Sequence, residues 1–574
     1  MIKGIPASPG IGIGKALVYK ETENLTPFAG RKITGNEVEN ELKRFGDALA
    51  AAEEYLQTIK NSAAGVVGEN ESLVFEAYQM LIRDPLFSEM VQTNIKIELL
   101  ASEAAVLKAV DKIREMFEAI DNEYMKQRAD DMVNVGKHVM DALLGRERMN
   151  LARLEENVIL IARDLAPAET VSLDAGHIKG IALEKGGVTS HTAILARTLG
   201  IPAIVGCGGD IRRISPGTTV IADGATGVII VNPDPEEIGA YEGKLRQQGE
   251  KIKEIAKLKD EPAQTTDGVK IELAGNIAGP DDALAVLENG GDGVGLFRTE
   301  FLYLGRKQLP DEEEQFQAYK RAAEIMGKRP CIIRTLDVGG DKQPQNIDIP
   351  PEMNPFLGYR AIRICLNEKR LFKTQLRAIL RASAFGNLKV MFPMISGLEE
   401  LRAAKEILAE VKREMEGQAI PFAQNIPVGI MVETPAAVMI ADLLAAEADF
   451  FSIGTNDLCQ YTLAVDRMNE KVSYLYNPLH IGVLRSIQRI IDAGHQAGIS
   501  VGLCGEMASG AENALVLLGL GLDEFSMAAS AIPSIKGMIR KLSFQKAREI
   551  AGKVMEMKEA SQISNYIKGQ FNVD

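Results

Sequence analysis

Tryptophan is absent from the 574-residue sequence, and aromatic residues make up only 5% of it. Proteins that bind single-stranded nucleic acid stack bases on aromatic side chains, so this class has little support. The 65 Lys and Arg residues are outnumbered by 79 Asp and Glu residues, which leaves a formal net charge of -14. A broad nucleic-acid surface needs a basic stripe, so no nucleic-acid partner is expected, whereas basic protein partners remain compatible.

Cysteine is scarce as well. The five cysteines are scattered, and no two have C-x-x-C spacing, so neither a disulfide framework nor a zinc site is indicated. No stretch is long and apolar enough to span a bilayer. The opening residues MIKGIPASPGIGIGK lack the basic-then-apolar pattern of a secretory signal. We therefore expect a cytoplasmic protein without membrane insertion.

The remaining composition is that of a soluble globular protein, with 46% hydrophobic and 25% charged residues. A chain of 574 residues exceeds what one hydrophobic core usually organises, so two or more domains are expected. Residues 1–22 contain short strand-like runs that Pro9, Gly10 and Gly14 interrupt. They predict one or two strands joined by tight turns.

Helical periodicity follows this segment. Apolar residues recur at steps of three and four, as in an amphipathic helix, over four segments: about 38–59, 73–82, 106–120 and 132–144. They predict a small antiparallel bundle over residues 23–147. Short strands return in residues 148–231, so we expect residues 1–22 to join them in one α/β domain, with the bundle inserted within it.

The second half of the sequence follows a polar, charge-rich segment, residues 232–260, that predicts a linker helix. Residues 261–574 then carry eight apolar runs, each followed by helical sequence. Eight such units predict a (β/α)8 barrel (a TIM barrel), and the whole chain is predicted to be an α/β multidomain protein. The predicted strands are IELAGNI, GVGLFRTE, CIIRTLDVG, LKVMFPMI, VGIMVETP, FFSIGTND, SVGLCGE and DEFSMAA.

Polar residues follow several of these strands at the end where barrel enzymes place their chemistry. They are Arg298, Arg334, Asp337, Glu433, Asn456, Asp457, Cys504 and Glu506. A single charged residue at a strand end can simply be exposed to solvent. Solvent exposure alone does not explain why a whole set of polar residues lies on one face. Arginine forks suit phosphate or carboxylate oxygens, and Glu433 with Asp457 offers the oxygen ligands that Mg²⁺ prefers. The set predicts a site for a small, doubly anionic phosphate ester held on a metal.

Two further residues have alternative interpretations. Cys504, in GLCGE, is either a small buried core residue or a proton donor. A lone histidine such as His191 is usually structural, but in GGVTSHTAILART it follows a strand and stands in the first turn of a predicted helix, which Thr189 or Ser190 would cap. A phosphoryl group on His191 would meet the unpaired N–H groups of that helix end. His191 is therefore a candidate phosphoryl acceptor.

The motifs together resemble a known family, enzyme I of the bacterial phosphoenolpyruvate-dependent sugar phosphotransferase system. The resemblance covers essentially the whole chain. It rests on these segments: ASPG (7–10), GGVTSH (186–191), GVGLFRTEFL (293–302), NPFLGYRAIR (354–363), VETPAA (432–437), IGTNDL (453–458) and GLCGE (502–506).

This resemblance implies a phosphoenolpyruvate-protein phosphotransferase in which His191 carries the phosphoryl group on Nε2, with Thr170 near its ring. It implies that phosphoenolpyruvate is held by Arg298, Arg334, Arg467, Asn456 and the backbone at Asp457, with Lys342 and Arg360 around the phosphate. Glu433 and Asp457 would bind Mg²⁺, and Cys504 would protonate the enolate carbon. The helical insertion would dock the phosphocarrier protein HPr, and the barrel would form a homodimer.

The sequence departs from the family pattern in two places. Val188 stands where the family often has Arg beside the active histidine, which would change how the phosphorylated ring is neutralised. Arg83 and Pro85, in LIRDPLF, lie where relatives tend to be acidic, at the expected docking surface for the carrier.

Three other functions are consistent with parts of the pattern. A pyruvate, phosphate dikinase or phosphoenolpyruvate synthase shares the histidine domain and barrel, but needs a large nucleotide-binding domain where this chain has the helical insertion. A nitrogen-type paralogue of the same relay is expected to carry an added N-terminal sensory domain, whereas this sequence starts close to ASPG. A non-catalytic sensor of phosphoenolpyruvate would not need the reactive set of His191, Glu433, Asp457 and Cys504.

Overall fold

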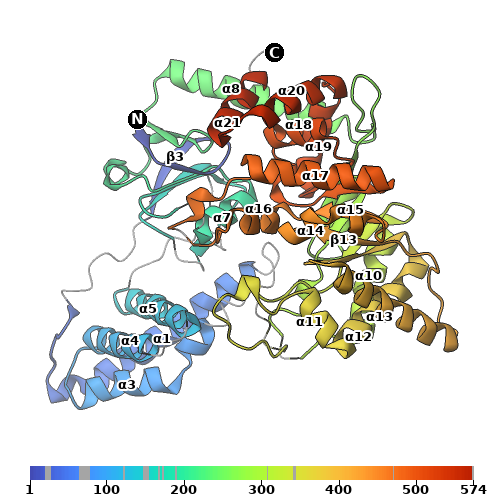
Figure 1. Cartoon of the computed structure of the whole chain (residues 1–574). Helices are drawn as coiled ribbons and strands as arrows, with labels where there is room; N and C mark the ends of the chain where they lie inside the picture. Colours follow the sequence, from blue (N-terminus) through green and yellow to red (C-terminus); the bar gives the residue numbers. More distant parts are fainter. Residues whose placement is uncertain are drawn as a thin grey trace. The chain divides into compact units, whose positions relative to one another are not determined.

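The computed structural model divides the chain into two compact units, Met1–Gln247 and Gln248–Asp574 (Figure 1). Each unit is considered by itself below. Among the described residues, no helix combines the length and apolar character needed to cross a membrane. The described residues are 1–19, 28–63, 78–119, 123–145, 151, 154, 156–165, 169–170, 173–187, 190–306, 308–340, 344, 346–469 and 471–571.

The first unit contains an eight-stranded sheet in the order β1-β8-β7-β3-β4-β5-β6-β2. β3 pairs with β4 in parallel and with β7 antiparallel. The N-terminal strands and those after residue 157 therefore build one sheet, as the sequence predicted. The strands are β1 (Ile2–Lys3), β2 (Ile5–Ser8), β3 (Ile11–Tyr19), β4 (Val158–Ala162), β5 (Ile178–Leu183), β6 (Ala203–Val205), β7 (Thr219–Asp223) and β8 (Val228–Val231).

The predicted break at Gly14 is wrong, because β3 runs through it without interruption. A Cβ atom on Gly12 would lie 1.9 Å from the Lys179 carbonyl oxygen, and one on Gly14 would lie 3.0 Å from that of Asn157. These glycines permit a close approach of neighbouring backbone within the sheet rather than a turn. The turn is at Gly10, whose φ of +126° is a conformation that glycine tolerates best.

Helices occupy the chain between β3 and β4, as predicted. They are α1 (Val38–Ala63), α3 (Pro85–Lys96), α4 (Ser102–Glu118) and α5 (Glu123–Leu143). Residues 78–82 are also helical, and the remainder of the predicted helix 73–82 lies outside the described residues. Phe45 and Leu56 of α1 pack with Val106 of α4 and Val139 of α5 in one buried cluster. The predicted apolar faces therefore meet in a bundle core.

A buried carboxylate joins two helices of this bundle. Glu41 of α1 accepts a hydrogen bond from the backbone N–H of Ser102, at 2.7 Å, where α4 begins. Arg44 pairs with Glu41 at 2.7 Å and with Glu103 at 2.6 Å. Because Ala101 has no side chain that can cap α4, a carboxylate from another helix satisfies its N-terminal N–H group.

The second unit contains a closed parallel barrel in the order β10-β11-β12-β13-β14-β15-β16-β9. All eight predicted barrel strands are present, which confirms the predicted fold class. Most are short apolar runs buried on both faces, as parallel strands covered by helices require. The strands are β9 (Glu272–Ile277), β10 (Gly293–Phe297), β11 (Cys331–Arg334), β12 (Leu388–Phe392), β13 (Val428–Val432), β14 (Phe450–Ile453), β15 (Ser500–Leu503) and β16 (Glu524–Met527).

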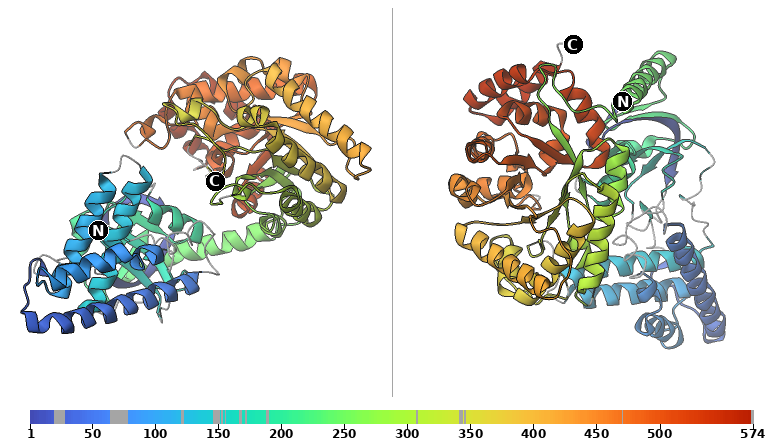
Figure 2. Two further views of the ribbon diagram at one scale, coloured as in Figure 1. Left: turned by 90° about the horizontal axis from the view of Figure 1, so that it is seen from below. Right: turned by 90° about the vertical axis from the view of Figure 1, so that its right-hand side faces the viewer.

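Helices lie around the outside of the barrel (Figure 2), and their apolar faces form one continuous core with the strands. α8 (Pro235–Ala256) precedes the barrel and spans the division between the two units. The others are α9 (Asp282–Glu288), α10 (Glu312–Met326), α11 (Ile362–Asn367), α12 (Lys369–Ala382), α13 (Leu398–Gly417), α14 (Pro435–Met439), α15 (Ala441–Ala445), α16 (Thr455–Leu463), α17 (Ile481–Ala497), α18 (Ala511–Leu520), α19 (Ile532–Ile539), α20 (Phe544–Glu556) and α21 (Ala560–Phe571).

Glu524, the first residue of β16, has its carboxyl group buried inside the barrel. A Cβ atom on Gly295 would lie 2.5 Å from its Oε1, and one on Gly502 would lie 3.0 Å away, so glycines on two strands make room for it. Oε1 has no hydrogen-bond partner among the described residues. Burial, and then the nearby carboxylate of Glu272, raises the pKa of Glu524 to about 7 despite the attraction of Lys389.

Replacing Glu524 by Gln is expected to stabilise the barrel at alkaline pH. Because the pKa is raised in the folded state, the stabilisation from the bound proton is complete below the ordinary value of 4.5 and is lost as the pH rises through about 7. This difference corresponds to at most roughly 3 kcal/mol at high pH. Urea unfolding of both forms across the pH range measures the effect.

The free energies of unfolding of wild type and Glu524→Gln are expected to become equal in acid, where the wild-type carboxyl is already neutral. Glu288→Gln, at an exposed carboxylate of α9, is the control and should show no such pH-dependent gain. Equal stability of wild type and Glu524→Gln at alkaline pH would contradict the assignment.

Candidate functional site

The helix that begins at His191 is fixed at its N-terminus by Ser190. The Ser190 hydroxyl accepts a hydrogen bond from the Ala193 backbone N–H at 3.3 Å, and α7 (His191–Leu199) ends at Gly200 with φ +66°. Of the two predicted capping residues, Ser190 is therefore the cap, while Thr189 and Val188 lie outside the described residues. The His191 side chain also lies outside them, so the structure describes its backbone position, the first of α7.

Both sides of α7 are held by packing. Ala193 and Ala196 belong to the buried cluster on the sheet, and Leu195 belongs to the core of the helical bundle. Thr170 is buried at 2% exposure, and its Oγ1 lies 3.4 Å from Oγ1 of Thr192. Thr170 therefore lies beside the first turn of α7, because Thr192 is next in sequence to His191.

The carboxyl ends of the barrel strands bring together a second set of residues. Arg334 is the last residue of β11, Glu433 directly follows β13, and Asp457 lies in the first turn of α16 after β14. Parallel strands that close into a barrel present all their carboxyl ends on one face. Arg334 and Glu433, which are 99 positions apart in sequence (433 − 334), therefore lie on the same face of the barrel.

Arginines and carboxylates form a buried network at this end of the barrel. Arg334 Nη1 lies 2.8 Å from Asp337 Oδ2, and its other terminal nitrogen pairs with Glu300. Arg360 Nη2 lies 3.0 Å from Asp337 Oδ1 and 3.3 Å from Asp457 Oδ2. Each of these five residues is less than 9% exposed. Asp337 thus bridges the two guanidinium groups.

The charges in this network do not balance. Burial opposes the charge on both arginines, but the carboxylates around them, Asp337 first, outweigh it and raise the pKa of Arg334 and of Arg360. The pKa of Glu433 is also raised, by burial first and then by Asp457 and Asp337. With Glu433, the network contains four carboxyl groups (Glu300, Asp337, Glu433 and Asp457) and two arginines, so negative charge is in excess when all of them are ionised.

This surplus fits a bound cation. Glu433 Oε1 accepts a hydrogen bond from the Met394 backbone N–H at 2.7 Å, and Asp457 Oδ1 is buried without a hydrogen-bond partner in the described structure. Among the described residues, no group of three or more His, Cys, Asp and Glu side chains could hold a metal. A site with two protein carboxylates completed by substrate oxygens is the arrangement that Mg²⁺ commonly adopts.

Cys504 lies at the same end of the barrel, between an apolar cluster and the charges of Arg334 and Glu433. It belongs to a buried cluster with Leu296, Met431 and Phe450, and its Sγ lies 3.8 Å from the Ile453 carbonyl oxygen. Burial raises the pKa of the thiol to about 11. Cys504 is therefore protonated at neutral pH, and both sequence interpretations, core residue and proton donor, agree with its position.

The remaining predicted residues lie outside this buried network. Arg298 is exposed after β10, and its backbone N–H donates to the Ile277 carbonyl at 3.0 Å. Arg467 is half-buried, with its backbone N–H 3.2 Å from Gln460 Oε1. Asn456 Oδ1 accepts from the Glu506 backbone N–H at 3.3 Å. Lys342 lies outside the described residues.

Sequence reasoning missed three residues that support this site. Glu300 pairs with Arg334, and the Tyr461 hydroxyl lies 3.0 Å from Arg360 Nη1. Gln375 of α12 accepts from the Leu336 backbone N–H at 2.9 Å and donates to the Thr299 hydroxyl at 3.2 Å.

Two of the three had a usable signal in the sequence. Glu300 stands two residues after Arg298 at a strand end, and Tyr461 follows Asp457 by one helical turn, which places both on one face of α16. Gln375 had none, because it is one polar position in an otherwise amphipathic helix.

Comparison with known proteins places the chain in a class. Family models for phosphoenolpyruvate-utilising enzymes match three consecutive regions: the N-terminal model residues 3–128, the mobile-domain model residues 154–227 and the phosphoenolpyruvate-binding-domain model residues 252–544. The last match contains the arginine and carboxylate network, and the mobile-domain match contains α7.

Several relatives match this chain over its full length. A Geobacillus stearothermophilus protein named phosphoenolpyruvate-protein phosphotransferase is 46% identical over 573 residues, covering 100% of this chain and 98% of that protein. Proteins of the same name from Bacillus subtilis (strain 168) and Staphylococcus aureus are 46% and 44% identical, each covering 99% of this chain and 99% and 100% of their own lengths. The chain belongs to the phosphoenolpyruvate-protein phosphotransferase family.

Proposed function

We propose that the chain takes the phosphoryl group of phosphoenolpyruvate onto His191 and passes it to the phosphocarrier protein HPr, releasing pyruvate as the first step of a sugar phosphotransferase system. The observation that carries this proposal is the full-length similarity to proteins named for that activity. The capped start of α7 at His191 agrees with it, because helix N-termini stabilise phosphoryl groups.

Substrate binding is assigned to the carboxyl end of the barrel. Arg298, Arg334 and Arg467, with Asn456 and the Asp457 backbone, would hold phosphoenolpyruvate, and Lys342 and Arg360 would lie around its phosphate. Arg298 is exposed and Arg467 is half-buried, and neither forms an ion pair with a described carboxylate. Their guanidinium groups are therefore available to an anionic ligand.

Glu433 and Asp457 are proposed to hold Mg²⁺. When bound, the cation would neutralise the negative charge of the phosphoryl oxygens and orient the substrate. The excess of carboxyl groups over arginines in the network, and Asp457 Oδ1, which has no hydrogen-bond partner among the described residues, support this assignment. Arg334 and Arg360, positioned by Asp337, spread the remaining charge while His191 attacks phosphorus.

Cys504 is proposed as the acid that completes the reaction. As the bond between phosphorus and the enol oxygen breaks, the electron pair remains on the enolate, whose terminal carbon then takes the thiol proton. The thiolate regains a proton from solvent. A thiol whose pKa is raised to about 11 holds its proton at neutral pH until a basic carbon is presented.

Transfer to the carrier requires movement. His191 belongs to one compact unit and the barrel to the other, so the ring must meet the barrel in one step and HPr in the next. The helical bundle is the proposed docking surface, and its core includes Leu195 of α7. A homodimer through the barrel and a cytoplasmic location remain predictions.

Incubating the protein with phosphoenolpyruvate labelled in its phosphoryl group tests the proposal. We expect labelled protein that loses its label in acid but not in base, as phosphohistidine does, and that transfers it to HPr. Chelation of divalent cations should slow labelling by at least about tenfold, since the site lacks its neutralising charge. Absence of labelling with cation present would refute the function, and labelling unaffected by chelation would refute the metal.

A further inference from the structure

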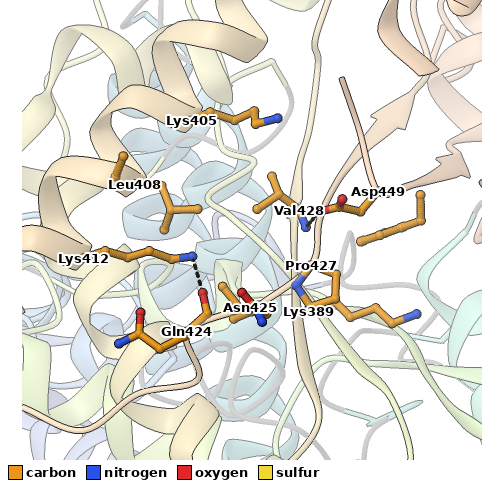
Figure 3. Close-up of a pocket in the computed structure, with 12 residues that line it drawn as sticks. Lys389, Lys405, Leu408, Lys412, Gln424, Asn425, Pro427, Val428 and Asp449 are labelled. Carbon is orange, nitrogen blue, oxygen red and sulfur yellow. Dashed lines mark hydrogen bonds between the residues drawn. The ribbon is translucent and has the colours of Figure 1, made fainter. Parts of the chain in front are cut away.

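A cavity of about 580 Å³ opens at the end of the barrel opposite the phosphoenolpyruvate site. It is lined by the first residues of β12, β13 and β14, by α13, and by the loop that joins α13 to β13. Figure 3 shows the side chains of Lys389, Lys405 and Lys412 around it. The amino-terminal end of a barrel usually serves stability, so three lysines around one cavity there need an explanation.

The three lysines are half-buried, and none makes an ion pair among the described residues. Lys412 Nζ donates to the Gln424 carbonyl at 2.9 Å, and Lys405 Nζ donates to the Glu447 carbonyl at 2.6 Å. Lys389 Nζ lies 5.3 Å from the centre of the Phe450 ring. Each ammonium has three donors, so every one of them retains hydrogen-bonding capacity for an anion.

The acidic groups nearby neutralise this cluster only in part. Asp449 lines the cavity and attracts Lys412, so it offsets one of the three lysine charges, while its Oδ2 also accepts the Val428 backbone N–H at 2.6 Å. The Glu447 carboxylate pairs with Arg402 instead, with Arg402 Nε at 3.0 Å. Glu524 interacts with Lys389 from inside the barrel, where burial favours its neutral form. The cavity therefore carries a surplus of positive charge.

We infer that this cavity binds a small phosphate monoester, independently of the phosphoenolpyruvate site. Lysine ammonium groups act as point charges that suit a compact, doubly charged phosphate. Planar carboxylates are better matched by arginine forks, and no arginine lines the cavity among the described residues. The volume lies within the range of small-molecule sites. Leu408, Phe450 and the Asn425 amide are placed to contact the body of the ester.

Pyridoxal 5′-phosphate is a suitable probe because it is a phosphate monoester that carries an aldehyde. A neutral lysine amine condenses with the aldehyde to an imine and water, and borohydride reduces the imine to a stable amine. Burial lowers the pKa of Lys412, which raises its neutral fraction. We expect peptide mapping to find Lys412 labelled at probe concentrations that leave exposed lysines largely unmodified.

Competition separates this site from the catalytic one. Glycerol 3-phosphate should protect Lys412 from the probe, whereas glycerol should not, and phosphoenolpyruvate-dependent labelling of the protein should persist after modification. Protection by succinate as effective as that by glycerol 3-phosphate would overturn the phosphate assignment. Uniform modification of lysines without protection would overturn the site itself, with the proposed phosphotransferase activity unaffected.

A pair of variants tests the charge cluster. Lys405→Gln removes one ammonium from the cavity and should weaken probe labelling of Lys412 by about tenfold, the value of one charge-assisted hydrogen bond. Arg413→Gln, at an exposed residue beside Lys412 on α13, is the matched control and should leave labelling unchanged. Equal labelling in all three proteins would overturn the inference.

Discussion

Replacing His191 by Ala is expected to abolish phosphorylation of the chain by phosphoenolpyruvate. The imidazole is the only acceptor in the proposed reaction, so its removal should lower the rate of labelling by at least about 10⁴-fold. Labelled phosphoenolpyruvate followed by electrophoresis under basic conditions measures the rate. Substrate binding, measured by calorimetry, should be unchanged because the proposed binding residues lie in the barrel.

His177→Ala is the control for this experiment. His177 belongs to the same unit, where its Nδ1 lies 2.8 Å from Asp174 Oδ2, and it is partly exposed. This variant should be labelled at the wild-type rate. Full-rate labelling of His191→Ala would remove His191 from the mechanism, and loss of labelling in both variants would point to unfolding of the unit rather than to chemistry.

Replacing Asp337 by Asn is expected to lower the free energy of unfolding of the barrel by about 3 kcal/mol, because two buried guanidinium groups lose a shared carboxylate. Arg334 Nη1 and Arg360 Nη2 lie 2.8 Å and 3.0 Å from its two oxygens. Asparagine keeps the shape but offers neither charge nor a second acceptor. Urea unfolding followed by circular dichroism measures the loss.

Asp281→Asn provides the comparison for an exposed pair. Asp281 lies 3.0 Å from Arg321, and both side chains are more than half exposed, so its replacement should change stability far less. Similar losses in the two variants would show that the Asp337 network contributes no more than a surface ion pair. In that case Asp337 would not be a positioning residue for the arginines.

Local pattern was sufficient for much of the fold. Eight apolar runs bounded by turns predicted the barrel strands, because parallel strands covered by helices are buried on both faces. The helices of the bundle followed from the spacing of apolar residues such as Phe45 and Leu56. Gly14 was misinterpreted because a glycine in a turn and one in a crowded strand look alike in sequence.

The sequence predicted which residue types form the candidate site, but it did not predict which of these residues contact one another. Strand-end positions predicted that Arg334, Glu433 and Asp457 would share a face, because closure of a barrel brings the carboxyl ends of its strands together. The pairing of Arg360 with both Asp337 and Asp457 joins residues 23 and 97 positions apart. No local rule predicts such pairs.

The sequence by itself determined the barrel, the sheet strands, the helix that begins at His191 and the chemical types of the residues around the proposed substrate. Those features depend on periodicity and on which residue types tolerate strand ends and helix caps. Only the tertiary structure decided which carboxylate neutralises which arginine, and that Lys389, Lys405 and Lys412 surround one cavity. These facts depend on distances between remote segments, which exist only after the barrel closes.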